Sequence, residues 1–233
     1  MRKIKLIVVV SLVTLGLMSP INMAFSGSPQ VVQEWQPAKE LSAEWWQWVW
    51  SIPGSVNPLL DTTGDHCAVG QRGDVWFLAG TFGGTVVRTC IVPEDKTLFF
   101  PVINSGPFDS PNQCGQGPDS LGSVKDMRAL AAATIDAATN LSVTLDGKSV
   151  KQIQRVRSEV FEVSMPPDNV YVLFGYTPCD PGVYSPAVDD GYYAHINPLH
   201  VGSHTLHIHA ESLPTGFVLD VTYHLNVVPV KVK

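Results

Sequence analysis

The stretch GSHTLHIHAESLPTGFVLDVTYHLNVV, residues 202–228, contains two segments in which apolar and polar residues alternate. Alternation with a period of two is typical of a β-strand that buries one of its faces. The apolar faces are predicted to consist of Leu206, Ile208 and Ala210 in the first segment and Phe217, Leu219, Val221, Tyr223 and Leu225 in the second. Leu213-Pro214-Thr215 separates the segments, so the stretch is predicted to form a hairpin.

Matching the apolar faces of this hairpin places Asp220 opposite His207 or His209 on the polar face. The preceding segment, GYYAHINPL (residues 191–199), alternates as well and puts Tyr193 and His195 on its polar side. If the chain folds back through residues 200–202, His195 also faces His207 or His209. Both registers predict one cluster on the outer surface of a sheet.

A metal site is one interpretation of this cluster, with His195, His207 and His209 as ligands and Asp220 as a fourth ligand or hydrogen-bond acceptor. Neighbouring positions on paired strands lie about 5 Å apart, so three imidazoles can converge on an ion. Zinc or copper suits imidazole ligands, and an open coordination position would permit hydrolysis. A polar sheet face that happens to be rich in histidine, or a pH-responsive surface, explains the same pattern.

The remainder of the chain predicts a mainly β protein, a single β-sandwich of the immunoglobulin-like or jelly-roll-like kind over residues 27–233. Segments 75–80 and 85–92 flank the glycine-rich TFGG and are expected to form a hairpin, and segment 169–176 is expected to be a strand. Asp146-Gly147 predicts a tight hairpin turn. Two helices are predicted, a Trp-rich one over residues 42–51 and an inserted one over residues 123–139, where Ser123 and Asp126 form a capping pattern.

Export is predicted from the amino-terminal residues 1–26. A basic start (Arg2, Lys3, Lys5) precedes the apolar run 6–17, and small residues follow, as in a secretory signal peptide. Such a segment is removed, so the mature protein is expected to be secreted or periplasmic, without stable membrane insertion. Four cysteines in an oxidising compartment predict two disulfides, for which Cys67–Cys90 and Cys114–Cys179 are favoured among the three possible pairings.

Charge excludes one class of partner. The chain has 15 Lys and Arg against 21 Asp and Glu, and the basic residues are scattered, which argues against nucleic-acid binding. Carboxylates in loops, including Asp189 and Asp190, are interpreted as turn formers.

Several stretches of the chain are DTTGDHCAVGQRGDVWFLAGTFGGTVVRTCIVP, LFFPVIN, and, near the end, DGYY, GSHTLHIH and LDVTYHL. Together they resemble a widespread family of secreted, β-rich microbial proteins that have no established activity. The resemblance implies a shared β-rich fold and export, and it assigns no catalytic residue.

Function is therefore left between three hypotheses. The first is an exported binding or structural protein whose partner is a small molecule, a glycan or another protein. The second is a metal-dependent enzyme built on the histidine cluster. The third is a carbohydrate-binding module in which Tyr193 and the tryptophans of segment 42–51 contact the sugar, although tryptophans on all sides of a helix more often pack inside a protein.

Overall fold

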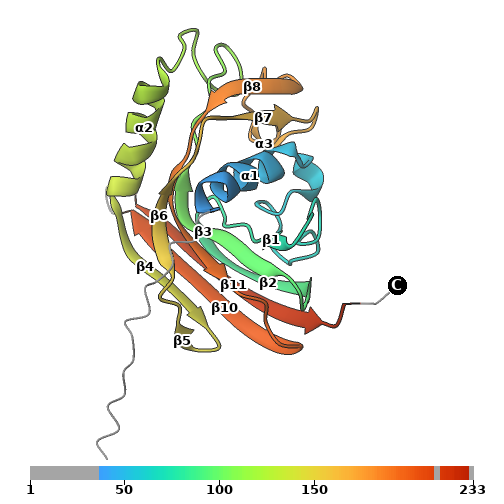
Figure 1. The fold of residues 1–233 in the computed structure, drawn as a ribbon. Helices are drawn as coiled ribbons and strands as arrows, with labels where there is room; N and C mark the ends of the chain where they lie inside the picture. The colour runs from blue at the N-terminus through green and yellow to red at the C-terminus, as the bar shows by residue number, and fades with distance from the viewer. Residues whose placement is uncertain (1–36, 213–215, 231–233) are drawn as a thin grey trace, which may run out of the picture. The chain divides into compact units, whose positions relative to one another are not determined.

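The computed structural model of the chain describes residues 37–212 and 216–230. The predicted signal peptide over residues 1–26 lies outside these ranges. Within them, no helix is long and apolar enough to cross a membrane. The structure is mainly β, with sheets packed against one another and helices at their sides (Figure 1).

One sheet has four strands in the order β1-β3-β9-β6. They are β1 (Val75–Phe77), β3 (Thr97–Ser105), β9 (Asp190–Ile196) and β6 (Ile153–Arg157). β1 runs parallel to β3, whereas β9 is antiparallel to both of its neighbours. Both faces of this sheet are covered.

A second sheet has five strands in the order β2-β11-β10-β4-β5. They are β2 (Gly84–Pro93), β11 (Phe217–Val228), β10 (Gly202–Ser212), β4 (Ala138–Leu145) and β5 (Lys148–Ser149). β10 and β11 are antiparallel, as predicted, while β2 joins β11 in parallel. The predicted turn at Asp146-Gly147 is confirmed: it joins β4 to β5, and both residues have positive φ.

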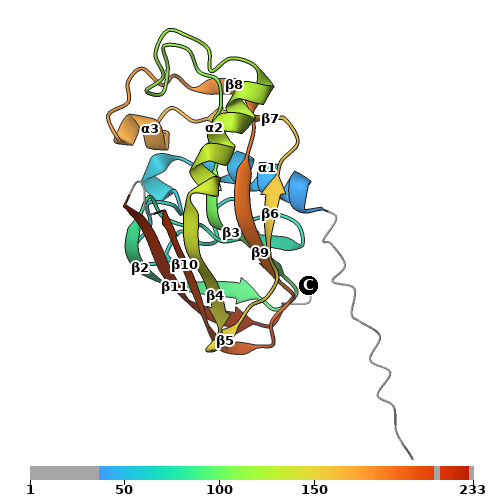
Figure 2. The same cartoon turned by 90° about the vertical axis from the view of Figure 1, so that its left-hand side faces the viewer.

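The two sheets face each other across a shared apolar core (Figure 2). The five-stranded sheet contributes the alternating residues expected from the sequence, so the predicted inward faces of β10 and β11 are confirmed. The four-stranded sheet contributes residues such as Leu98, Phe100, Ala194 and Ile196. Burial of these side chains removes apolar surface from water and supplies most of the driving force for this layer.

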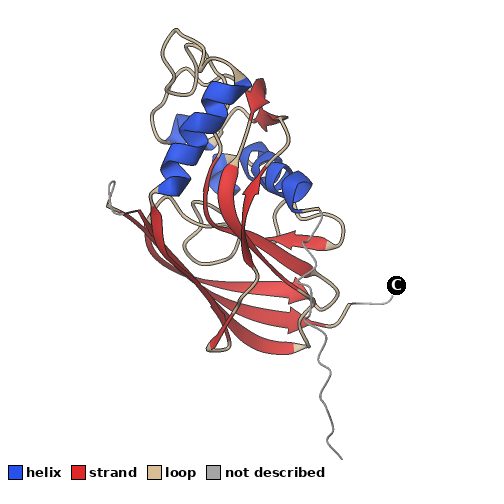
Figure 3. Ribbon diagram, turned by 60° about the vertical axis from the view of Figure 1, so that its left-hand side comes forward, coloured by secondary structure: helices blue, strands red, loops and turns tan. Residues whose placement is uncertain are grey.

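Helix α1 (Ala38–Ser51) covers the other face of the four-stranded sheet and forms a second apolar core there (Figure 3). All four of its tryptophans are buried. Three of their indole N–H groups donate outside the helix: Trp45 to the Leu78 carbonyl, Trp46 to Asp189 and Trp48 to the Val69 carbonyl. The tryptophans therefore pack α1 onto the sheet.

The remaining elements complete the two cores. Helix α2 (Val124–Asp136) packs against β3 and β9, and its predicted capping box is present, because Ser123 accepts from the Asp126 amide and Asp126 from the Ser123 amide. A two-stranded sheet of β7 (Phe161–Met165) and β8 (Gly182–Ala187), the short helix α3 (Val170–Leu173) and the 3-10 turn Gly54–Val56 lie on the α1 side.

Both predicted disulfides, Cys67–Cys90 and Cys114–Cys179, are present. The hairpin predicted for segments 75–80 and 85–92, which Cys67 and Cys90 would flank, is absent, so that prediction is wrong. β1 pairs with β3 and β2 pairs with β11, so the two strands belong to different sheets. The bridge instead fastens the turn around residues 61–70 to β2.

Two further elements differ from the sequence-based prediction. Segment 169–176, expected to be a strand, contains α3, because the Asn169 side chain accepts from the Val172 amide and caps a helical turn. The Trp-rich helix begins at Ala38, four residues before its predicted start at residue 42. The inserted helix ends at Asp136, three residues before its predicted end at residue 139.

Candidate ligand-binding sites

The outer face of the five-stranded sheet carries two of the three predicted histidines. Asp220 lies opposite His209, and its carboxylate is within hydrogen-bond distance of both imidazoles. One oxygen lies 3.2 Å from His207 Nε2, and the other lies 3.1 Å from His209 Nδ1. His209 Nε2 lies 3.1 Å from Glu211 Oε1. The result is a chain of imidazoles and carboxylates linked pairwise along the sheet.

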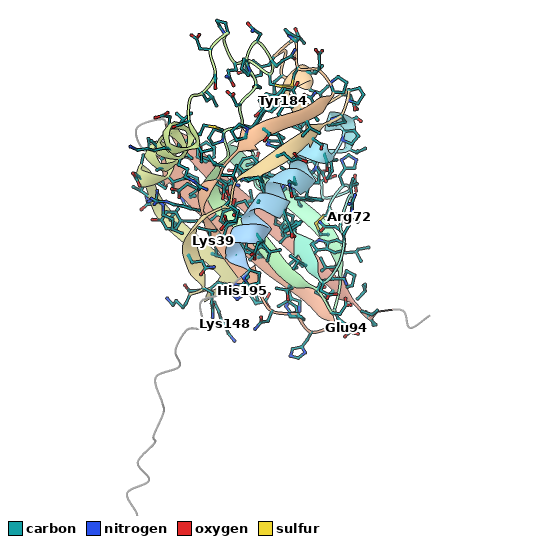
Figure 4. All side chains as sticks on the ribbon, turned by 45° about the horizontal axis from the view of Figure 1, so that its top comes forward. Lys39, Arg72, Glu94, Lys148, Tyr184 and His195 are labelled. Carbon is teal, nitrogen blue, oxygen red and sulfur yellow. A yellow bond between two sulfur atoms is a disulfide. The ribbon has the colours of Figure 1, made fainter. Side chains whose placement is uncertain are left out.

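His195 does not join this chain, and the register that placed it there is wrong. β9 pairs with β3 and β6 in the four-stranded sheet, whereas β10 pairs with β4 and β11. His195 therefore lies in the other sheet, near Lys148 at a separate surface hollow (Figure 4). Burial lowers the pKa of its imidazole.

Without His195, the predicted three-imidazole site is not assembled. Across residues 37–212 and 216–230, no group of three or more His, Cys, Asp or Glu side chains is arranged to hold a metal ion. His207, His209 and Asp220 remain together, but their polar atoms are directed at one another rather than at a common point.

Tyr193, predicted to be exposed and to bind a ligand, is fully buried. Its ring stacks on Phe99 at a centroid distance of 5.1 Å, and its hydroxyl accepts from Asn104 Nδ2 at 3.0 Å. The alternation rule fails here because helix α1 covers the side of β9 that was expected to face water.

Asp189 lies in the same buried region and is not a surface turn residue. One carboxyl oxygen accepts from Trp46 Nε1 at 2.8 Å, and the other has no hydrogen-bond partner among the described residues. Burial raises its pKa to about 8, against the opposing effect of the Trp46 hydrogen bond. The adjacent Asp190, which sequence reasoning also assigned to a turn, is the first residue of β9 and is paired with Arg155 and Arg157.

A hollow in the described surface, here called the α1 groove, has a volume of about 510 Å³. One side of α1, the loop at residues 70–75 and strands β1 and β7 enclose it. Trp48 and Phe77 form an aromatic wall, with ring centroids 5.5 Å apart. The polar and charged side chains of the groove are those of Glu44, Gln47, Ser51, Arg72, Asp74, Glu162 and Ser164.

The α1 groove contains four charged side chains. The side chains of Glu44, Arg72, Asp74 and Glu162 form no ion pair or hydrogen bond with another residue of the described part of the chain, and all four residues are exposed. Figure 4 shows Arg72 beside α1. One sequence signal points to this site, the Trp-rich helix, but no local pattern indicates that the loop at 70–75 and β7 lie alongside it.

Comparisons with known proteins identify no relative. No protein-family model, no curated protein and no solved structure matches the chain.

Proposed function

We propose that the protein is an exported binding protein and that the α1 groove holds its ligand, a neutral or amino-bearing saccharide. The observation that carries this proposal is the combination, in one hollow, of an aromatic wall with four charged side chains that have no partner among the described residues. The groove is within the usual size range of small-molecule sites, which are a few hundred to about 1,000 Å³.

The ligand class follows from the chemistry of the groove. Indole and phenyl rings offer flat apolar surfaces for the C–H faces of a sugar ring, while carboxylates, amides and hydroxyls can bond its hydroxyl groups. Three carboxylates, those of Glu44, Asp74 and Glu162, accompany the single guanidinium of Arg72. The excess of negative charge disfavours acidic ligands and favours neutral or positively charged ones.

Export is supported by the basic and apolar residues at the amino terminus, by two disulfides, and by the resemblance to secreted microbial proteins. We further propose that the two facing sheets form a β-sandwich of the immunoglobulin or jelly-roll kind. Their common apolar core supports this proposal.

The first prediction concerns binding in the α1 groove. Titration with a panel of neutral and amino oligosaccharides should change tryptophan fluorescence, because Trp48 lines the groove. Glu162→Gln combined with Arg72→Ala should weaken binding by tenfold or more, since each hydrogen bond to a charged group contributes about 1.5–3 kcal/mol.

Glu159→Gln is the matched control, since Glu159 is exposed, lies three residues from Glu162 and does not line the groove. The Glu159→Gln variant should bind the saccharides with the same affinity as the unmodified protein. The proposal fails if no saccharide of the panel binds, or if the control weakens binding as much as the double variant does.

A further inference from the structure

A separate cavity of about 160 Å³ lies on the other side of the tryptophan helix. Its wall is mostly apolar and aromatic and includes Trp46, Trp50, Phe82 and Phe217. None of its lining residues lines the α1 groove. The cavity therefore provides a site whose occupancy does not depend on the proposed saccharide function.

The volume of this cavity defines the size of its occupant. An engineered cavity of about 150 Å³ lined by apolar side chains stays dry and binds benzene. A cavity of about 160 Å³ thus accommodates one six-membered aromatic ring with a small substituent. Aromatic walls favour an aromatic occupant, since offset and edge-to-face ring pairs add to the effect of burial alone.

The wall offers a side-chain acceptor to a ligand, the carbonyl oxygen of Asn104. Asn104 uses its Nδ2 to donate to Tyr193, and its carbonyl oxygen forms no hydrogen bond within the described part of the chain. The indole N–H of Trp50 also has no hydrogen-bond partner among the described residues, but it is buried and closed to solvent, so only the ring of Trp50 serves the cavity. A donor on a ligand would therefore bond Asn104.

The wall is held open by contacts behind it. Trp46 is fixed by its hydrogen bond to Asp189 at 2.8 Å, and its ring lies directly on Gly106, where a Cβ would come within 2.4 Å of the indole. Asn104 is fixed by the Tyr193 hydroxyl. A site whose walls are already in place spends little free energy on ordering side chains when the ligand binds.

An apolar surface leads to the cavity. Phe82, which lines it, is 50% exposed and meets Phe174, also 50% exposed, edge to face at a centroid distance of 5.0 Å. Contiguous exposed apolar side chains of this kind often mark the mouth of a binding site.

We propose that this cavity binds a small phenol, with the aromatic ring between Trp46, Trp50 and Phe82 and the hydroxyl group donating to the side-chain carbonyl of Asn104.

Isothermal titration with phenol and with toluene tests the proposal, because toluene has the same shape and lacks the hydroxyl. Phenol is expected to bind at one site with a Kd of about 0.1–1 mM, which is well within the ceiling for a ligand of about seven non-hydrogen atoms. Toluene should bind at least fivefold more weakly. Equal affinity for the two compounds, or no saturable phenol binding, overturns the proposal.

A variant pair locates the site. Phe82→Ala should weaken phenol binding at least fivefold, whereas Leu130→Ala, which removes an equally exposed apolar side chain on α2 away from the cavity wall, should change it less than twofold. Thermal unfolding of both variants verifies that each is folded. Phenol binding that Phe82→Ala leaves unchanged would overturn the assignment, whatever the outcome of the saccharide titrations.

Discussion

Asp189 holds a carboxyl group in the interior of the protein, between the tryptophan helix and the four-stranded sheet. Desolvation disfavours its charged form, and the nearby charge of Asp190 acts in the same direction, so its pKa rises to about 8. At neutral pH the group therefore keeps its proton. A neutral acid costs far less to bury than a carboxylate, which explains how this residue is tolerated beside Trp46.

Asp189 should make stability depend on pH between about 4 and 8. In this range the unfolded carboxyl ionises while the folded one does not, so its contribution is complete below pH 4 and is lost as pH rises to 8, by roughly 1.4 kcal/mol per pH unit. Asp189→Asn removes this dependence. Urea unfolding from pH 4 to 9 should show the stability of the unmodified protein falling relative to that of the variant. A constant difference between the two proteins would contradict the assignment.

At single positions, sequence patterns correctly predicted which side chains of β10 and β11 point outward, but they did not predict which side chains around β9 are buried. Asp220 was correctly placed opposite His209 because one face of that sheet is buried and the other is not. Tyr193 and Asp189 are buried by a helix that lies about 150 residues earlier in the sequence and covers the second face of the sheet. The local pattern therefore predicts, wrongly, that both residues lie at the surface. Local alternation contains no information on that distant contact.

Among the elements, β6, β9 and α2 are joined by one group of charges. Asp190 is 2% exposed and forms ion pairs with Arg155 at 2.7 Å and with Arg157 at 3.0 Å. Arg155 also forms an ion pair with Asp136 of α2 at 2.6 Å. A buried carboxylate is stable only when it is paired, so these contacts fix the position of the sheet edge relative to the helix.

Arg155→Ala should destabilise the protein by about 2–3 kcal/mol, below the usual 3–5 kcal/mol for breaking a buried pair because Arg157 remains. Arg157→Ala is the control and should cost less than about 1 kcal/mol, since the Arg157 side chain is 60% exposed. Urea unfolding at pH 7 measures both values. Equal losses in the two variants would show that Arg155 has no special role.

Element prediction succeeded where the pairing is local and failed where it is not. β10 with β11, β4 with β5, and the cap of α2 were predicted from adjacent residues. The expected hairpin at 75–92 is absent because the chain passes from one sheet to the other between β1 and β2, through Gly83 and Gly84, both with positive φ. The α1 groove and the smaller cavity combine segments far apart in sequence, so neither could be predicted.

For the whole molecule, each disulfide attaches a loop that lies outside the regular strand pairing: Cys67–Cys90 attaches one to β2, and Cys114–Cys179 joins two loops. Replacing both cysteines of a pair by serine should cost roughly 3–4 kcal/mol, by loop-closure entropy. The loss should be larger for Cys114–Cys179, which spans 65 residues, than for Cys67–Cys90, which spans 23. Urea unfolding of the two double variants checks the order, and a larger loss for Cys67–Cys90 would show that strain or residual unfolded-state structure outweighs loop length.

The position of β11 has a consequence for how the protein is made. This strand, nearest the carboxyl end of the sequence, lies between β10 and β2, so it is an interior strand of the five-stranded sheet. A growing chain that has emerged only as far as β9 has β2 without its neighbour β11 and cannot assemble this layer. Folding is therefore expected to be late and governed by long-range pairing, which is slow. Such a delay suits the export proposed above, because a chain that has not yet folded can be threaded across a membrane.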